Sequence, residues 1–404
     1  MFKRGGYTQD LGHRFGFLPY FPKSEKKRLW IQGVSVGEVN AIANFVALLS
    51  REYEVVLTTT TTTARKIIAD KLSQNVLFHG YFPWDFWPFS SLAWRRVQPD
   101  AVILVESELW PEHICQARKR GIPIFLVNAR LSDRSFQRYA YFPRFGRWIF
   151  EALNFVAASS EEDRKRIAHF YGGEIESFGN MKFDLGAVLL SPLERKNLKK
   201  ELGFGTDTFV IMGCSTWPGE EELLLKAFRE IQKKTEKKER KLALLLVPRH
   251  VERRRELVKL LERERVSFSQ RSLGAKVKGV DVCLGDTTGE LPRLIQVADL
   301  AYIGKSLSPN EGGQSPLEAA MAGIPIVYGN RMTNFRDICS QLERENAAWK
   351  VESESEAIGA IVELSENAQK RQLLAKNISR WFNSNRGASE KTYAFIRRQL
   401  EHFS

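Results

Sequence analysis

The chain of 404 residues lacks several features that would place it in a common class. Its four cysteines form no C-x-x-C pair, and its six histidines show no metal-binding spacing such as H-E-x-x-H. We therefore expect reduced, structural cysteines and no resident metal. No apolar run reaches about 18 residues, and residues 1–20 do not resemble a signal peptide. We expect no spanning helix, so any work at a membrane would be peripheral.

Nucleotide- and nucleic-acid-binding motifs are also missing. No G-x-G-x-x-G follows the first apolar strand, which argues against an ordinary NAD enzyme. Gly304-Lys305-Ser306 resembles part of a P-loop, but Asp299 stands where the first glycine should be. No helix-turn-helix and no aromatic–basic strand pattern is present, so we expect no nucleic-acid partner. The net charge of +13 still favours an anionic partner, either a phosphorylated substrate or an anionic lipid surface.

Apolar runs and helical segments alternate along most of the chain, in two series. This alternation predicts two α/β domains, each a doubly wound parallel sheet. We place the domains at 1–190 and 200–380, joined by a charge-rich connector at 192–201, with a helix at 381–404 that packs back on the first domain. In the first domain, one expected strand begins at residue 29 and the others cover 54–60, 75–79, 101–105, 123–128 and 155–159. In the second domain, the expected strands cover 209–214, 242–247, 280–284, 300–303 and 324–328.

Three pairs of residues have the S/T-x-x-E spacing of a helix capping box, each soon after an expected strand. Taken alone, this spacing favours plain capping. Helix N-termini at the ends of parallel strands also bind phosphate, and the two interpretations are compatible. The pairs are Ser35/Glu38, Thr287/Glu290 and Ser315/Glu318, with Pro316 in the favoured first helical position.

Charged residues also follow two other apolar strands. Glu106 and Glu108 come directly after 101–105, and Arg249 follows 242–247. The carboxylates are either a solvated rim or an acid, a base or a stabiliser of positive charge. An arginine at this position suits a phosphate or carboxylate ligand, although it could be an ordinary surface residue. Lys182 is a weak signal in isolation.

Together, seven short motifs in order resemble the 3-deoxy-D-manno-octulosonic acid (Kdo) transferase family over about residues 10–390. The resemblance implies a GT-B glycosyltransferase with two Rossmann-like domains facing a cleft. It implies transfer of Kdo from CMP-Kdo to a lipid A precursor, lipid IVA, with inversion, at the cytoplasmic face of the inner membrane during lipopolysaccharide assembly. The motifs are Ser35-Val36-Gly37-Glu38, Glu106-Ser107-Glu108-Leu109-Trp110-Pro111, Asn128-Ala129-Arg130-Leu131-Ser132, Lys182-Phe183-Asp184, Leu246-Val247-Pro248-Arg249-His250, Gly285-Asp286-Thr287-Thr288-Gly289-Glu290 and Pro316-Leu317-Glu318-Ala319.

The resemblance also implies roles for single residues. Glu38 would be the general base, and Glu106 and Lys182 would stabilise the transition state, without a cofactor or metal. The residues implied to hold CMP are Pro248, Arg249, Thr288, Gly289, Glu290, Ser315, Pro316, Leu317 and Glu318. The chain departs from the family on this donor side at Trp217-Pro218, Lys305 and Gln314-Ser315, where relatives often have His-Glu, the second glycine of a Gly-Gly pair, and His-Asn.

Two alternatives remain open from the sequence. One is a GT-B transferase or epimerase that uses another nucleotide sugar, which would leave the paired Glu38 and Glu106 unexplained. The other is a non-catalytic protein that binds a membrane surface. Basic residues of the first half could seat either a lipid substrate or an anionic bilayer. The aromatic residues expected to help are Phe15, Phe17, Tyr20, Phe21 and those at 84–88.

Overall fold

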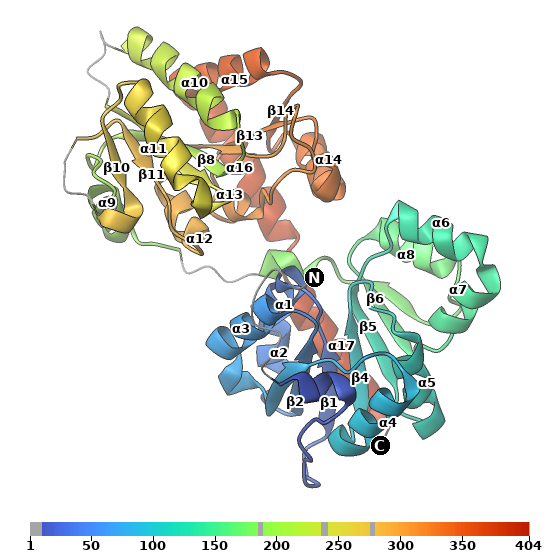
Figure 1. Cartoon of the computed structure of the whole chain (residues 1–404). Coiled ribbons are helices and arrows are strands. Elements are labelled where there is room, and N and C mark those ends of the chain that lie inside the picture. The colour runs from blue at the N-terminus through green and yellow to red at the C-terminus, as the bar shows by residue number, and fades with distance from the viewer. Residues whose placement is uncertain (1–9, 185–188, 236–240, 275–278, 404) are drawn as a thin grey trace. The chain divides into compact units, whose positions relative to one another are not determined.

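The computed structural model describes residues 10–184, 189–235, 241–274 and 279–403. The chain forms two compact units (Figure 1). Unit 1 comprises residues 1–186 and 385–404, and unit 2 comprises residues 187–384. Each unit is built on one parallel sheet of seven strands, with helices on both faces.

In unit 1 the strands run in the order β3-β2-β1-β4-β5-β6-β7. The first strand is therefore central, and the chain moves outward from it in both directions. The strands are β1 (Arg28–Gln32), β2 (Glu54–Thr59), β3 (Phe78–Tyr81), β4 (Ala101–Val105), β5 (Ile124–Ala129), β6 (Phe155–Ala158) and β7 (Ile175–Ser177). The helices are α1 (Val36–Ala41), α2 (Ala43–Leu49), α3 (Thr62–Lys71), α4 (Trp87–Val97), α5 (Pro111–Arg120), α6 (Asp133–Tyr141), α7 (Pro143–Phe150), α8 (Glu161–Ala168) and α17 (Ala388–His402).

Strand β1 shows why its sequence is apolar throughout. Successive side chains of a strand point to opposite faces, so a sheet covered on both faces buries every position. Leu29 and Ile31 pack in the core under α1, α2, α3 and α17, while Trp30 packs in the core under α4, α5, α7 and α8. All three side chains have no exposed surface.

Helix α17 belongs to unit 1 although it ends the chain. Its Phe395 ring stacks on Phe155 of β6 with the ring centroids 3.7 Å apart. The carboxylate of Asp184 accepts the backbone N–H groups of Gly387 and Ser389, each at 2.6 Å, at the start of this helix. The two ends of unit 1, at Asp184 and Gly387, are thereby tied together.

Unit 2 repeats the arrangement, in the strand order β10-β11-β9-β8-β12-β13-β14. Its first strand is again central. The strands are β8 (Phe209–Thr216), β9 (Leu242–Pro248), β10 (Phe268–Gln270), β11 (Val282–Leu284), β12 (Leu300–Ile303), β13 (Ile326–Gly329) and β14 (Trp349–Val351). The helices are α9 (Pro192–Glu201), α10 (Glu220–Thr235), α11 (Arg254–Arg263), α12 (Leu291–Leu294), α13 (Leu317–Met321), α14 (Arg336–Arg344), α15 (Glu354–Glu366) and α16 (Ala368–Ser384).

The predicted fold class of two doubly wound sheets is confirmed, but three details were wrong. Strands β7, β10 and β14 were not predicted, and all three are short edge strands. The predicted connector at 192–201 is helix α9, which begins with a complete capping box between Ser191 and Glu194. The predicted helix after β1 is two helices that meet at Ile42. Within the described residues, no helix combines the length and apolarity needed to cross a bilayer.

Candidate functional site

The candidate site of unit 1 lies where strands β1 and β4 end side by side. From this pair the chain continues to β2 on one side of the sheet and to β5 on the other. The loops after β1 and β4 therefore diverge, which is where open α/β sheets bind their ligands. Glu38 stands in the first turn of α1, directly after β1, and Glu106 and Glu108 stand directly after β4.

Glu38 is held by its own loop. Ser35 is the N-cap of α1, and its hydroxyl accepts the Glu38 backbone N–H at 3.2 Å. The same hydroxyl donates to Glu38 Oε1 at 2.7 Å, and the Val34 N–H donates to Oε2 at 2.8 Å. A carboxylate offers about four lone-pair sites, so these bonds fix the group and leave part of its accepting capacity free. The Glu38 residue is 7% exposed.

Glu106 and Lys182 form an ion pair that joins two distant segments. Lys182 Nζ lies 2.7 Å from Glu106 Oε1, and both side chains are mostly buried. Lys182 is part of a short 3₁₀ helix, Met181–Asp184, which Asp184 ties to the start of α17. The structure thus brings together two of the residues to which the resemblance gave one shared role.

Asn128, at the end of β5, supports this pair and received no role from the sequence. Its side-chain oxygen accepts the Met181 N–H at 2.9 Å, and its amide nitrogen lies 3.5 Å from Glu106 Oε1. Asn128 and Glu106 both have left-handed backbones, with φ of 51° and 56°. Asparagine adopts this conformation more readily than most residues. The only sequence signal for this role was its place in the 128–132 motif.

Three carboxylates influence one another at this edge of the sheet. Burial raises the pKa of Glu38, the bonds from Val34 and Ser35 lower it, and the charge of Glu106 raises it further. Burial, followed by the charge of Glu38, raises the pKa of Glu108 to about 7. Glu38 can therefore act as a base of increased strength, while Glu108 titrates near neutral pH. From the sequence, Glu108 was either a solvated rim residue or an acid, a base or a stabiliser of charge, and the resemblance gave it no role of its own.

Unit 2 has a corresponding edge, where β8 and β12 end. Glu220 opens helix α10 there and is 3% exposed. Its carboxylate accepts the N–H groups of Trp217 at 2.8 Å, Lys305 at 2.9 Å and Ser306 at 3.2 Å, and the Tyr302 hydroxyl lies 3.5 Å away. Burial raises the pKa of Glu220 to about 7, against the effect of these hydrogen bonds. This carboxylate connects the loops that follow the two strands.

The three sequence departures on this side fall around the same loops, and Gln314 joins them by donating its backbone N–H to Gly304 at 3.1 Å. Lys305 has a left-handed backbone with φ of 60°, and its ammonium lies 4.6 Å from the centre of the Trp217 ring. Trp217 also contacts His250, with the ring centroids 5.2 Å apart. The residue before His250, Arg249, donates its backbone N–H to Thr216 at 3.1 Å and is exposed. Its guanidinium has no carboxylate partner within the described residues.

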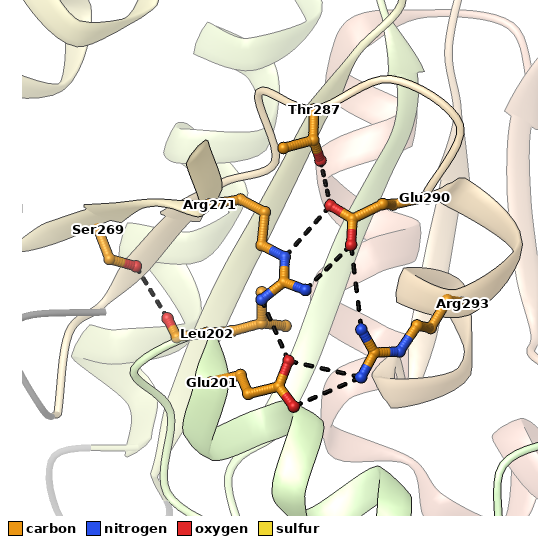
Figure 2. A network of polar contacts seen from close by, with 7 residues as sticks. All are labelled: Glu201, Leu202, Ser269, Arg271, Thr287, Glu290 and Arg293. Carbon is orange, nitrogen blue, oxygen red and sulfur yellow. Dashed lines mark hydrogen bonds and ion pairs between the residues drawn. The ribbon is translucent and has the colours of Figure 1, made fainter. Parts of the chain in front are cut away.

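The Thr287/Glu290 pair is not a capping box, which corrects the prediction. Helix α12 begins only at Leu291 and is four residues long. The Thr287 hydroxyl donates to the Glu290 carboxylate, and Arg271 binds that carboxylate at 2.9 Å (Figure 2). The hydrogen bond from Arg271 lowers the pKa of Glu290, against the effect of burial. Arg271 also binds Glu201 of α9 at 3.2 Å. Thr288 and Gly289 lie exposed beside this network.

The Ser315/Glu318 pair was also wrongly predicted as a capping box. Pro316, rather than Ser315, is the N-cap of α13, a helix of five residues, and it makes no side-chain capping bond. The Ser315 hydroxyl accepts the Leu317 N–H at 3.3 Å. Burial raises the pKa of Glu318, while Ser315 lowers it, and Glu318 Oε2 is buried without a hydrogen-bond partner among the described atoms. Pro248 and Leu317 are buried at their strand and helix ends.

Comparison with known proteins gives consistent results. Residues 9–185 match the family described as 3-deoxy-D-manno-octulosonic-acid transferase (kdotransferase). The 3-deoxy-D-manno-octulosonic acid transferase of Haemophilus influenzae is 32% identical over 98% of this chain and 92% of its own length. The enzyme of the same name from Bordetella pertussis is 30% identical over 90% of this chain and 85% of its own length. Among solved structures, the UDP-GlcNAc 2-epimerase of Neisseria meningitidis bound to UDP-GlcNAc matches with a TM-score of 0.62 at 15% identity, over 92% of this chain and 100% of that one. This last likeness shows the fold alone.

Proposed function

The chain belongs to the 3-deoxy-D-manno-octulosonic acid transferase family, and from that premise we propose that it transfers Kdo from CMP-Kdo to lipid IVA with inversion at the anomeric carbon. The observation that carries this proposal is the arrangement at the ends of β1 and β4. A buried carboxylate with a raised pKa, Glu38, stands on the edge of the sheet that also carries the Glu106–Lys182 ion pair. A membrane-surface protein without catalysis would not need these groups.

In the proposed reaction, Glu38 removes the proton of a glucosamine 6-hydroxyl as that oxygen attacks the anomeric carbon of Kdo. The carbon–oxygen bond to the CMP phosphate breaks, and CMP leaves as a phosphate monoester. General-base catalysis of this kind contributes roughly 10²–10⁴-fold. Glu106 and Lys182 would stabilise the charge that develops on the Kdo sugar and on the attacking and leaving oxygens in the transition state. A pre-formed ion pair can do this without reorganising during the reaction.

The residues of unit 2 would hold CMP. Arg249 has a fixed backbone and no carboxylate partner within the described residues, so its guanidinium is available to the leaving phosphate. Thr288, Gly289, Glu290, Pro248 and the 315–318 segment would supply the remaining contacts. Because α12 and α13 are only four and five residues long, single N–H groups and side chains, rather than long helix dipoles, would make these contacts.

We also propose that unit 1 docks on the cytoplasmic surface of the inner membrane, where the acceptor resides. Five aromatic side chains in residues 17–87 are exposed and could enter the headgroup region: Phe17 57%, Tyr20 65%, Trp84 51%, Phe86 60% and Trp87 60%. Phe21 was also expected there but is 7% exposed and buried in the core, and Phe15 packs on Trp84 and Phe89. Failure to co-sediment with anionic liposomes at low salt would contradict docking.

The decisive experiment is release of CMP from CMP-Kdo that depends on lipid IVA, followed by mass spectrometry of the lipid. We expect a lipid product that is heavier by one or more Kdo residues. The matched control replaces CMP-Kdo by UDP-GlcNAc. Turnover of the UDP-sugar alone would instead support an epimerase or another nucleotide-sugar transferase, and no turnover with either donor would support a binding protein.

A further inference from the structure

A small cavity opens beside Glu106 in unit 1, and apart from Glu106 its lining residues have no role in the reaction just described. Its volume is about 50 Å³, which suits a single small group rather than an acyl chain. Apolar side chains such as Leu126, Phe150 and Ile167 form part of its wall. Its polar lining includes Glu106, Arg130 and Arg138 together with two serines, Ser107 and Ser135. The cavity therefore combines an apolar wall with two guanidinium groups.

The charge around the cavity is strongly positive. Residues 130–147 contain five arginines and one acidic residue, Asp133. Asp133 forms an ion pair with Arg166 of α8 at 2.5 Å. The other carboxylate in the lining, Glu106, is bound to Lys182. In the part of the chain that the structure describes, neither Arg130 nor Arg138 has a carboxylate partner, so both can take an anion from outside.

The backbone around Arg130 is fixed on both sides. Its own N–H donates to the Glu106 carbonyl at 3.2 Å, and the next N–H, of Leu131, donates to Asp163 Oδ1 at 2.8 Å. Arg130 stands two residues after Asn128, which contacts Glu106 and the Lys182 segment. The Arg138 guanidinium lies 5.6 Å from the centre of the Tyr139 ring. An anion bound by these arginines would therefore lie at a defined place next to Glu106.

We propose that Arg130 and Arg138 form a binding site for a phosphate monoester carried by the acceptor sugar. Guanidinium groups bind phosphate oxygens in pairs, with more geometric specificity than a lysine. Anchoring this phosphate would fix the acceptor ring, and so place its hydroxyl for Glu38. The proposal rests on the proposed function, since it assumes a phosphorylated acceptor. It adds a subsite that recognises the acceptor and assigns a role to the 128–132 motif.

The test compares two acceptors, lipid IVA and lipid IVA from which the phosphate of the accepting glucosamine has been removed. In neutral detergent micelles, Arg130→Gln should lower kcat/KM for the phosphorylated acceptor roughly 10- to 100-fold, mainly through KM, because a charge-assisted hydrogen bond is lost. It should leave kcat/KM for the dephosphorylated acceptor near the wild-type value. Arg138→Gln should act in the same direction. The matched control Arg144→Gln removes an exposed arginine of α7 that does not line the cavity, and it should change neither acceptor.

An equal loss on both acceptors, with the control unaffected, would overturn the proposal, because it would mean that Arg130 only supports the structure. A loss that appears on anionic vesicles but not in neutral micelles would also overturn it, since the phosphate would then belong to a lipid headgroup. CMP binding measured by calorimetry checks that each variant is folded. If the wild-type protein transferred Kdo to neither acceptor, the proposed function itself would fail, which is a separate outcome.

Discussion

The two units place a buried glutamate at the same point of the same topology, but use it differently. Glu38 follows the central strand of unit 1 and Glu220 follows the central strand of unit 2, each in the first turn of the next helix. The Glu220 carboxylate contacts four donors, three of them backbone N–H groups. The Glu38 carboxylate is held by Val34 and Ser35 of its own loop, and by no other segment in the described part of the chain.

This difference separates a structural carboxylate from one that is available for chemistry. A carboxylate accepts about four hydrogen bonds, so Glu220 is saturated and joins two loops, whereas Glu38 keeps capacity for a substrate hydroxyl. Their surroundings differ in the same sense. The charge of Glu106 raises the pKa of Glu38 and the charge of Glu221 raises the pKa of Glu220, but the loops around Glu220 also carry the cations Lys305 and Arg249. A base is expected in the first setting and an anion-binding site in the second.

The largest effect should come from Glu38→Gln. The change keeps the shape of the side chain but removes its ability to take a proton, so we expect kcat to fall by roughly 10²–10⁴-fold or more. CMP affinity, measured by calorimetry, should stay unchanged because the residues proposed to bind CMP lie in unit 2. Near-normal turnover would remove the distinction between the two glutamates.

Lys182→Met should have the next largest effect. It removes the cation bound to Glu106 at 2.7 Å, and losing one pre-formed electrostatic group typically costs roughly 10²–10³-fold in kcat. Single-turnover kinetics with saturating acceptor would measure the loss. Lys165→Met, an exposed lysine of α8 without a carboxylate partner in the described residues, is the matched control. If both variants behaved like the wild type, Lys182 would have no part in the transition state.

Glu220→Gln should act on stability rather than on chemistry. The amide has one oxygen in place of two and leaves buried N–H groups unpaired, at a cost of about 1–3 kcal/mol. We expect a lower melting temperature and weaker CMP binding, by calorimetry, with the same rate once donor is saturating. Glu230→Gln, at an exposed position on α10, should leave the melting temperature unchanged. A normal melting temperature in Glu220→Gln would show that its hydrogen bonds do not hold the loops.

Asn128→Asp should give the smallest effect of the series. It keeps the oxygen that accepts the Met181 N–H but removes the amide donor near Glu106 and adds a charge. One net hydrogen bond corresponds to roughly tenfold in rate or less, and the Lys182 ammonium, 2.7 Å from Glu106 Oε1, counters the added negative charge. We therefore expect kcat to fall by about tenfold with KM for CMP-Kdo unchanged. A loss as large as that of Lys182→Met would mean that Asn128 does more than position the pair.

The sequence predicted the central strands well because burial on both faces leaves a continuous apolar run, as in residues 101–105. It failed at three of the four sheet edges, and at the fourth it placed β3 about two residues too early. Strands such as Ile175–Ser177 are three residues long and are defined by a neighbouring strand rather than by their own pattern. Helix α9 was missed although Ser191, Pro192 and Glu194 give the signal of a complete capping box.

Spacing alone predicted the capping residues poorly. Ser35 caps its helix, but Thr287 and Ser315 do not, because helices α12 and α13 begin later than the motif requires. The Glu290 carboxylate is instead bound by Arg271, a residue 19 positions away that no local pattern could identify. In the same way, the contact between Asn128 and Met181 spans 53 residues and depends on the fold.

The most direct test of the central claim is the pH dependence of kcat/KM for lipid IVA in the wild type, Glu38→Gln and Glu108→Gln. A general base must be deprotonated, and the pKa of Glu38 is raised above its ordinary value of 4.5. We expect wild-type activity to fall on the acid side with a midpoint above 4.5. Glu108→Gln should keep this fall, and the residual rate of Glu38→Gln should lack it. An acid-side fall that persists in Glu38→Gln and disappears in Glu108→Gln would contradict the account and assign the base to Glu108.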